Sequence, residues 1–203
     1  QAGRFHGVQG KPAQRLHAPH HDGPAFRPAY SSDGRWLVYG VRRQLDFYAD
    51  RQRIVVYDRL ADRHVVVTED WDVDWASDWR FAPGTSRLAF TAEVAGRRSL
   101  FCMDAALAVD DRAARTPTCL ARGGWHGAPR PAGSRLFVSL QSLSRPPEVW
   151  AYPLDGGDGV QLSRFTAGAM AGVPLGEVQE RTLAGADSAS VQEFGSRAIS
   201  TST

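Results

Sequence analysis

One stretch of charged and aromatic residues has the composition of a ligand-contacting loop. Residues 46–53 read Asp-Phe-Tyr-Ala-Asp-Arg-Gln-Arg, which places carboxylates, a phenol and guanidinium groups close together. Such groups can hold the charged ends of a bound molecule. They can equally form salt bridges that cap a loop, each exposed pair contributing about 0–1 kcal/mol. The residues alone leave both interpretations open.

A second stretch, residues 71–79, alternates tryptophan with aspartate. Its tryptophans are four residues apart, at Trp71, Trp75 and Trp79. Acidic side chains in a loop or edge strand could attract cationic peptide ends. We favour the alternative that Trp75 and Trp79 fill gaps between packed sheets. A calcium site is disfavoured, because the run has neither the central glycine nor the closing glutamate of a calcium loop.

The remaining nucleophiles and metal ligands form no recognisable catalytic set. Residues 20–22 are His-His-Asp, and neighbouring residues of an extended chain point to opposite faces, so we predict an exposed loop there. His126 lies beside a glycine and is expected to be structural. Cys102 and Cys119 form no Cys-x-x-Cys pair. We predict no catalytic residue, no metal and no cofactor.

The overall composition is that of a globular protein. Of the 203 residues, 42% are hydrophobic and 23% are charged, and the net charge is +2. This charge is too small to indicate a nucleic-acid partner. No run of about 18 apolar residues occurs, so no membrane span is expected.

A period near fifty residues organises the chain. Three similar segments each combine a glycine-containing turn, an arginine and an apolar run, and their leucines are Leu37, Leu88 and Leu136. Each segment precedes further short runs rich in β-forming residues. This pattern is typical of β-propeller blades. We predict an all-β fold, a partial β-propeller of about three to four blades of four-stranded antiparallel sheet.

The repeat sets the predicted boundaries. Blade repeats are expected near residues 18–68, 69–121 and 122–165, within a propeller portion that covers residues 1–172. Residues 173–194 contain two alternating runs separated by a turn and are predicted to form two linker strands. The Ser/Thr-rich residues 195–203 are predicted to be a disordered tail. Residues 104–115 are alanine-rich and are expected to form a loop with one or two helical turns.

Four segments resemble the propeller of prolyl-oligopeptidase-like serine peptidases, in particular bacterial dipeptidyl-peptidase and acylaminoacyl-peptidase-like members. They are PAYSSDGRW (28–36), similar to a blade-opening motif, FYADRQR (47–53), similar to a loop ending in Asp-basic-x-Arg, QSLSRPPEVW (141–150), similar to a strand-start motif, and GEVQER (176–181), similar to the strand leading into the hydrolase domain. The resemblance spans residues 26–194. It implies a partial propeller followed by the first strands of a missing α/β-hydrolase domain.

Two departures from this family affect function. Family members often have a glutamate at the position of Tyr48, and in related dipeptidyl-peptidases acidic propeller residues hold the substrate's free amino terminus. Asp46 and Asp50 remain as candidate anions. The sequence contains no Gly-x-Ser-x-Gly nucleophile motif, and it stops where the hydrolase part would begin. The resemblance therefore implies no catalytic residue here and a substrate-binding set consisting of Asp46, Tyr48, Asp50 and Arg53.

The resemblance implies a non-catalytic propeller fragment that gates substrate access and contacts peptide substrate in a full-length serine peptidase. Its partners would be that peptide and its own missing hydrolase domain. A TolB-like propeller module that binds a protein partner is the alternative, and a truncation product without function is a third. Because so few blades cannot close a ring, we expect both terminal blades to leave apolar faces uncovered, and the isolated chain to be marginally stable or to self-associate. A periplasmic and a cytoplasmic location both stay open.

Overall fold

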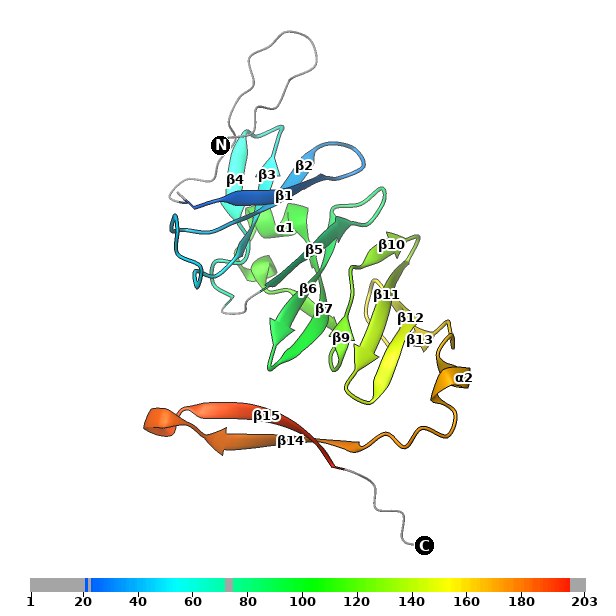
Figure 1. Cartoon of the computed structure of the whole chain (residues 1–203). Helices are drawn as coiled ribbons and strands as arrows, with labels where there is room; N and C mark the ends of the chain where they lie inside the picture. Colours follow the sequence, from blue (N-terminus) through cyan, green and yellow to red (C-terminus); the bar gives the residue numbers. More distant parts are fainter. Residues whose placement is uncertain (1–20, 22, 72–74, 198–203) are drawn as a thin grey trace, which may run out of the picture.

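The computed structural model describes residues 21, 23–71 and 75–197 (Figure 1). Nearly all of its regular structure is antiparallel β-sheet, which confirms the mostly-β prediction. The first unit is a four-stranded sheet in chain order, with strands β1 (Ala25–Tyr30), β2 (Trp36–Val41), β3 (Arg53–Asp58) and β4 (Arg63–Val66).

The second unit repeats this meander. Its strands are β5 (Trp75–Phe81), β6 (Arg87–Val94), β7 (Arg97–Asp104) and β8 (Thr118–Ala121). The alanine-rich connection between β7 and β8 forms a short helix, α1 (Ala105–Asp110), and a single 3-10 turn, η1 (Ala113–Arg115). The Asp104 carboxylate caps α1 by accepting a hydrogen bond from the amide of Leu107 at 3.1 Å.

The third unit contains five short strands. They are β9 (Trp125–His126), β10 (Arg130–Ala132), β11 (Arg135–Ser142), β12 (Arg145–Pro153) and β13 (Val160–Gln161). A helical turn, α2 (Ala167–Met170), follows. The chain then forms a two-stranded hairpin of β14 (Glu177–Ala184) and β15 (Ser190–Arg197), joined through η2 (Ala186–Ser188). Because β15 continues to Arg197, the predicted start of a disordered tail at residue 195 falls inside a strand, and residues 198–203 lie outside the described residues.

The second and third units are not the separate four-stranded sheets that the repeat predicts. Strand β9 pairs with β7 in parallel, at Arg98 and Trp125, and with β11 in antiparallel orientation, so hydrogen bonding continues from β5 to β13. Gly124, at φ +64°, allows this close approach, because a Cβ there would lie 2.5 Å from a carbonyl oxygen at the end of β11. Pro129 lacks an N–H and stands where the first strand of the unit divides into β9 and β10.

Facing sheet surfaces form the core. Residues of the first and second units pack together in one cluster that includes Val38, Ile54, Val56, Trp79, Leu88 and Phe90. Residues of the second and third units form another cluster that includes Ala89, Leu100, Cys102, Leu136, Val138 and Tyr152. The second unit is therefore covered on both faces. This explains why β6 and β7 are apolar over most of their length instead of alternating.

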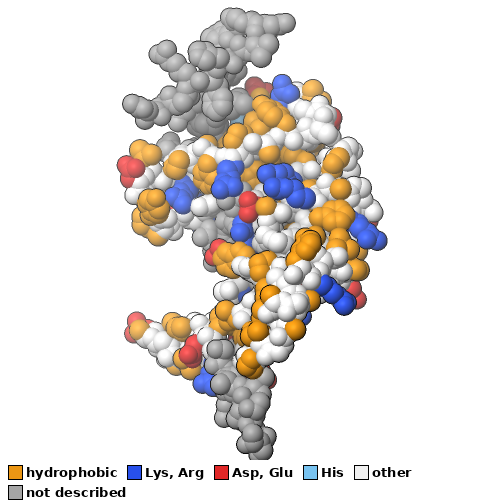
Figure 2. Space-filling model, turned by 45° about the vertical axis from the view of Figure 1, so that its right-hand side comes forward, with side chains coloured by type: hydrophobic (Ala, Val, Ile, Leu, Met, Phe, Trp, Pro, Cys, Tyr) orange, Lys and Arg blue, Asp and Glu red, His pale blue; other side chains and the backbone are white. Residues whose placement is uncertain are grey.

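The far faces of the two terminal units differ. In the first unit, Leu37, Tyr39 and Val55 are at most 5% exposed. In the third unit, Val160 and Leu162 are 55% and 50% exposed. Figure 2 turns the third unit forward and shows hydrophobic side chains on this surface. The prediction that both terminal faces are uncovered is therefore wrong for the first unit. Within the described residues, no helix has the length and apolar character needed to cross a membrane.

Candidate functional site

The candidate loop lies at one defined end of the units. Residues 42–52 connect β2 to β3, in the same position as residues 95–96 between β6 and β7 and residues 143–144 between β11 and β12. Equivalent connections of equivalent units emerge on the same side, which we call the loop end. The 42–52 connection is by far the longest of the three, and it contains the predicted residues Asp46, Tyr48 and Asp50, with Arg53 starting β3.

The hairpin of β14 and β15 lies beside the β6–β7 turn, at the loop end of the second unit (Figure 1). A guanidinium nitrogen of Arg97, just after the β6–β7 turn, lies 2.6 Å from a carboxylate oxygen of Glu180 in β14. The same guanidinium stands 4.8 Å from the ring centroid of Phe194 in β15. The Phe194 ring also covers Gly96, where a Cβ would come within 2.6 Å of it. The loop end is thus the side of the units that faces the C-terminal hairpin.

Asp50 and Arg53 lie together at the base of the loop. The Asp50 carboxylate accepts hydrogen bonds from the amides of Arg43 and Gln44 and from the Arg53 guanidinium, the last at 3.0 Å. Its side chain is 10% exposed and that of Arg53 is 7% exposed. Burial raises the pKa of Asp50. The hydrogen bonds from the Gln44 amide, the Arg53 guanidinium and the Arg43 amide together lower the pKa by more, so it lies below its ordinary value. These contacts close the loop upon itself.

Glu69 completes the base of the loop and was not among the residues predicted from the sequence. Its carboxylate pairs with Arg43, lies 3.2 Å from Nε of Arg53 and 3.9 Å from Arg51, and is 3.6 Å from Nε2 of His21. Arg51 also donates to the backbone carbonyl of Glu69 at 2.7 Å. Glu69 follows β4, which runs toward the loop end. Following the chain direction through the repeat would have indicated that residue 69 returns to the loop.

Asp46 and Tyr48 lie at the tip of the loop, apart from the base. Asp46 has a left-handed backbone, φ +59°, and is exposed. Tyr48 is 91% exposed, and its neighbours Leu45 and Phe47 are 65% and 50% exposed. The four predicted residues therefore divide into a buried, ion-paired pair and an exposed pair. Only the exposed tip presents side chains that an incoming molecule could contact without breaking the loop.

The tryptophan–aspartate run has a packing role wherever the structure describes it. Trp79 is 1% exposed, belongs to the core between the first two units and donates its indole N–H to the carbonyl of Arg27 at 3.0 Å. Asp78 pairs with Arg98 at 2.5 Å and with Arg27 at 3.5 Å. Trp71 packs edge-on against aromatic rings of the same core. Residues 72–74 and the predicted His20 and Asp22 lie outside the described residues, and no group of three or more metal-ligating side chains occurs among those described.

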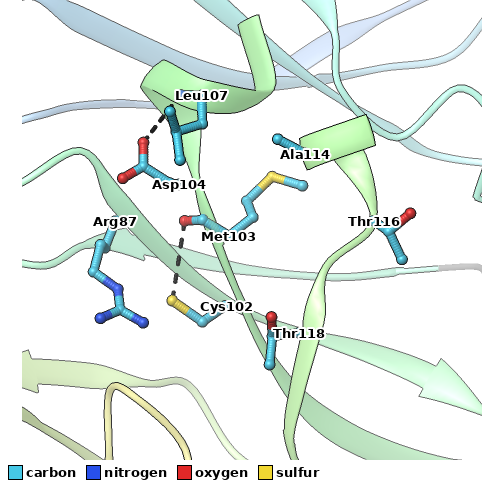
Figure 3. Close-up of a pocket in the computed structure, with 8 residues that line it drawn as sticks. All are labelled: Arg87, Cys102, Met103, Asp104, Leu107, Ala114, Thr116 and Thr118. Atoms are coloured by element: carbon cyan, nitrogen blue, oxygen red, sulfur yellow. Dashed lines mark hydrogen bonds between the residues drawn. The ribbon is translucent and has the colours of Figure 1, made fainter. Parts of the chain in front are cut away.

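A depression of about 360 Å³ opens near the opposite end, between β7 and the α1–η1 connection (Figure 3). Arg87, Cys102 and Asp104 line it, together with Thr116 and Thr118. The only thiol among them, Cys102, is 2% exposed, and burial raises its pKa despite the neighbouring Arg87 guanidinium. A thiol with a raised pKa is a weak nucleophile. Arg87 bridges instead to the third unit, donating to the carbonyl of Leu154 at 2.6 Å.

Glu148 fixes the segment that leads from the third unit toward the hairpin. Its buried carboxylate accepts hydrogen bonds from the hydroxyls of Ser163 and Thr166 and from the amides of Thr166 and Phe165. The Ser163 and Thr166 hydroxyls contribute most to lowering its pKa to about 2. Glu148 belongs to the resembling segment 141–150. Its contacts give this segment a structural role, which is to anchor the turn at residues 163–166.

The stacked antiparallel units have the fold of β-propeller domains. An acylaminoacyl peptidase from Pyrococcus horikoshii aligns with a TM-score of 0.62 and 17% identity over 82% of this chain and 24% of the peptidase. The propeller domain of the Trilobed protease from Pyrococcus furiosus aligns with a TM-score of 0.51 and 14% identity, over 68% of this chain and 39% of that one. TolB from Acinetobacter baumannii aligns with a TM-score of 0.51 and 18% identity, over 70% and 33%.

At these identities the similarity establishes the fold and nothing finer. The chain spans about a quarter of the length of the acylaminoacyl peptidase. No protein-family model matches the sequence, and no curated protein matches it. The propeller architecture predicted from the fifty-residue repeat is therefore confirmed at the level of the fold.

Proposed function

We propose that this chain is the propeller portion of a serine peptidase, where it gates access to the active site and contacts peptide substrate at the loop end. The observation that carries the proposal is the position of the 42–52 loop. The longest connection of the repeat emerges on the side where the β14–β15 hairpin docks. In the resembling peptidases, the corresponding strand leads into the hydrolase domain. A loop there would stand between solvent and the active site.

In this proposal the chain contributes shape and contacts, while the hydrolase domain would supply the chemistry. The sequence has no Gly-x-Ser-x-Gly motif, and Cys102 is a poor nucleophile. We expect no hydrolysis of peptide or ester substrates by this chain and no labelling by a serine-directed fluorophosphonate. Stoichiometric labelling together with hydrolysis would contradict this division of labour.

Photo-crosslinking tests the contact with peptide. A short peptide carrying a benzophenone side chain would be irradiated with the chain, and the attachment sites located by mass spectrometry. We expect attachment in residues 42–52 and the hairpin, reduced by Tyr48→Ala, which removes a side chain that is 91% exposed and leaves the loop base intact. Residues 31–35, which turn at the opposite end, are the internal control. Equal attachment at both ends would refute the proposal.

A binding module of the TolB type is the second candidate. The exposed apolar face of the third unit, with Val160 and Leu162 about half exposed, favours it, because uncovered apolar sheet faces bind other proteins. In this case, the loop end would show no preference for peptides. A protein partner would instead protect residues 149–162 from hydrogen exchange, a result that the peptidase proposal does not predict.

A further inference from the structure

Among the residues that the structure describes, the loop base contains more guanidinium groups than carboxylates. Four arginines contribute guanidinium groups, and they are Arg42, Arg43, Arg51 and Arg53. Two carboxylates face them, those of Asp50 and Glu69, and both already pair with arginines. Asp46, at the exposed tip, is the other carboxylate of the 42–52 loop. Glu69 alone is shared by three guanidinium groups, so the described carboxylates at the loop base are already engaged.

Arg42 is the arginine that the loop does not use. Its Nε is buried and has no hydrogen-bond partner among the described residues. Its guanidinium lies 5.4 Å from the ring centroid of Tyr48, and within the described part of the chain no carboxylate pairs with it. Arg43, beside it, is 52% exposed, although it contacts Glu69. The Arg42 side chain as a whole is half-buried, and its other guanidinium nitrogens also have no hydrogen-bond acceptor among the described residues, so an anion approaching the tip would meet these nitrogens.

The surroundings of Arg42 define what else the anion carries. Tyr48, Phe47 and Leu45 form an exposed apolar tip directly after the two arginines. Apolar and aromatic side chains this exposed can cover an aliphatic or aromatic group of a ligand. Guanidinium binds carboxylate through two parallel N–H···O bonds. The combination matches a carboxylate next to an apolar side chain.

We infer that the loop end binds a carboxylate group of a peptide, held by Arg42 and Arg43 with the adjoining apolar residue against Tyr48 and Phe47. This inference rests on the proposed function and specifies its ligand. It differs from the expectation that acidic residues here hold an amino terminus, because Asp50 is engaged by the loop itself and only Asp46 of the two candidate anions is exposed. The carboxylate can be the carboxyl terminus or an acidic side chain, and the two sources are separable experimentally.

The test is an NMR titration of the ¹⁵N-labelled chain with four peptides. They are acetyl-Gly-Leu with a free carboxylate, acetyl-Gly-Leu-amide, acetyl-Asp-Leu-amide and Gly-Leu-amide with a free amine. We expect saturable shifts of the amides in residues 42–52 with a carboxylate-bearing peptide. Response to the first peptide alone identifies the carboxyl terminus, and response to the third identifies an acidic side chain. Arg42→Gln should weaken this binding about tenfold, the equivalent of one charge-assisted hydrogen bond.

Controls separate a specific site from general attraction and from misfolding. Arg164→Gln removes the same charge from an exposed position in the third unit and should leave affinity unchanged. Arg42→Lys keeps the charge but not the fork, and should give an intermediate loss. Equal binding of the acid and the neutral amide, or preference for the free amine, overturns the carboxylate site while peptide contact at the loop survives. No response of residues 42–52 to any peptide overturns both proposals.

Discussion

Asp50→Asn is the substitution that most directly tests whether the base of the 42–52 loop is a scaffold. The Asp50 carboxylate holds two backbone amides and the Arg53 guanidinium at once. An asparagine offers one oxygen in place of two, so its NH₂ group must face either the amides or Arg53, all of which are donors. Arg53 keeps its contact with Glu69 at 3.2 Å and its bond to the carbonyl of Arg51 at 2.7 Å, so it is not left unpaired.

The expected cost follows from these contacts. Hydrogen bonds to a charged group contribute about 1.5–3 kcal/mol each, and breaking a buried ion pair costs about 3–5 kcal/mol when the partner is left alone. Because Arg53 retains Glu69, we expect the lower part of this range, about 2 kcal/mol of unfolding free energy at pH 7. Urea unfolding followed by tryptophan fluorescence would measure the difference at constant m-value.

The matched comparison is Tyr48→Ala, two residues away on the exposed tip. A surface substitution of this kind should change the unfolding free energy by no more than about 0.5 kcal/mol. The pKa of Asp50 is lowered in the folded chain, so its contribution is present above the ordinary aspartate pKa and is lost as the pH falls below it. If Asp50→Asn were as neutral as Tyr48→Ala at pH 7, or if its effect persisted unchanged at pH 2, the division into base and tip would be wrong.

Three further predictions concern the parts that support the loop end. The Glu148 carboxyl should titrate near pH 2 by ¹³C NMR. Its contribution to the unfolding free energy is therefore complete above its ordinary pKa of 4.5 and is lost as the pH falls toward 2. Glu148→Gln should remove this loss of stability between pH 4.5 and pH 2. His126 is fully buried, and burial lowers its pKa, so ¹⁵N NMR should show it titrating below the ordinary histidine value of 6.5. Its contribution to stability should be complete above that value and fall as the pH drops below it, where the unfolded chain takes up the proton more readily than the folded chain. Gly96→Val should release the hairpin, because the new Cβ would collide with the Phe194 ring. The backbone at this position has φ +64°, a conformation that costs a residue with a Cβ about 1–2 kcal/mol. The expected result is faster proteolysis within residues 177–197, with the circular dichroism of the sheets unchanged.

The sequence predicted the repeating units better than the strand pairing that links one unit to the next. Leu88 and Leu136 are fully buried in the cores between units, as expected of periodic apolar runs, and Trp79 fills a gap between units as the favoured interpretation held. The link through β9 was missed, because two residues are too short to show periodicity and the pairing depends on the backbone freedom of Gly124. The role of Glu69 was also missed, since its arginine partners lie 16 to 26 residues away in the chain.

The candidate site shows why residue types alone left two interpretations open. Asp46 and Asp50 are chemically identical in the sequence, yet one carboxylate is closed in by amides and Arg53 while the other lies in an exposed turn. What separates them is the path of the loop, which the Asp50 contacts themselves create. Once Asp50 is committed to folding the loop, the charges left for a ligand are those of Arg42, Arg43 and the exposed Asp46, and the peptide titration distinguishes the cationic pair from the carboxylate. In the proposed carboxylate site, Tyr48 stands at the position of the family's glutamate with the Arg42 guanidinium 5.4 Å from its ring, so the loop would offer a cation where the resemblance implies an anion.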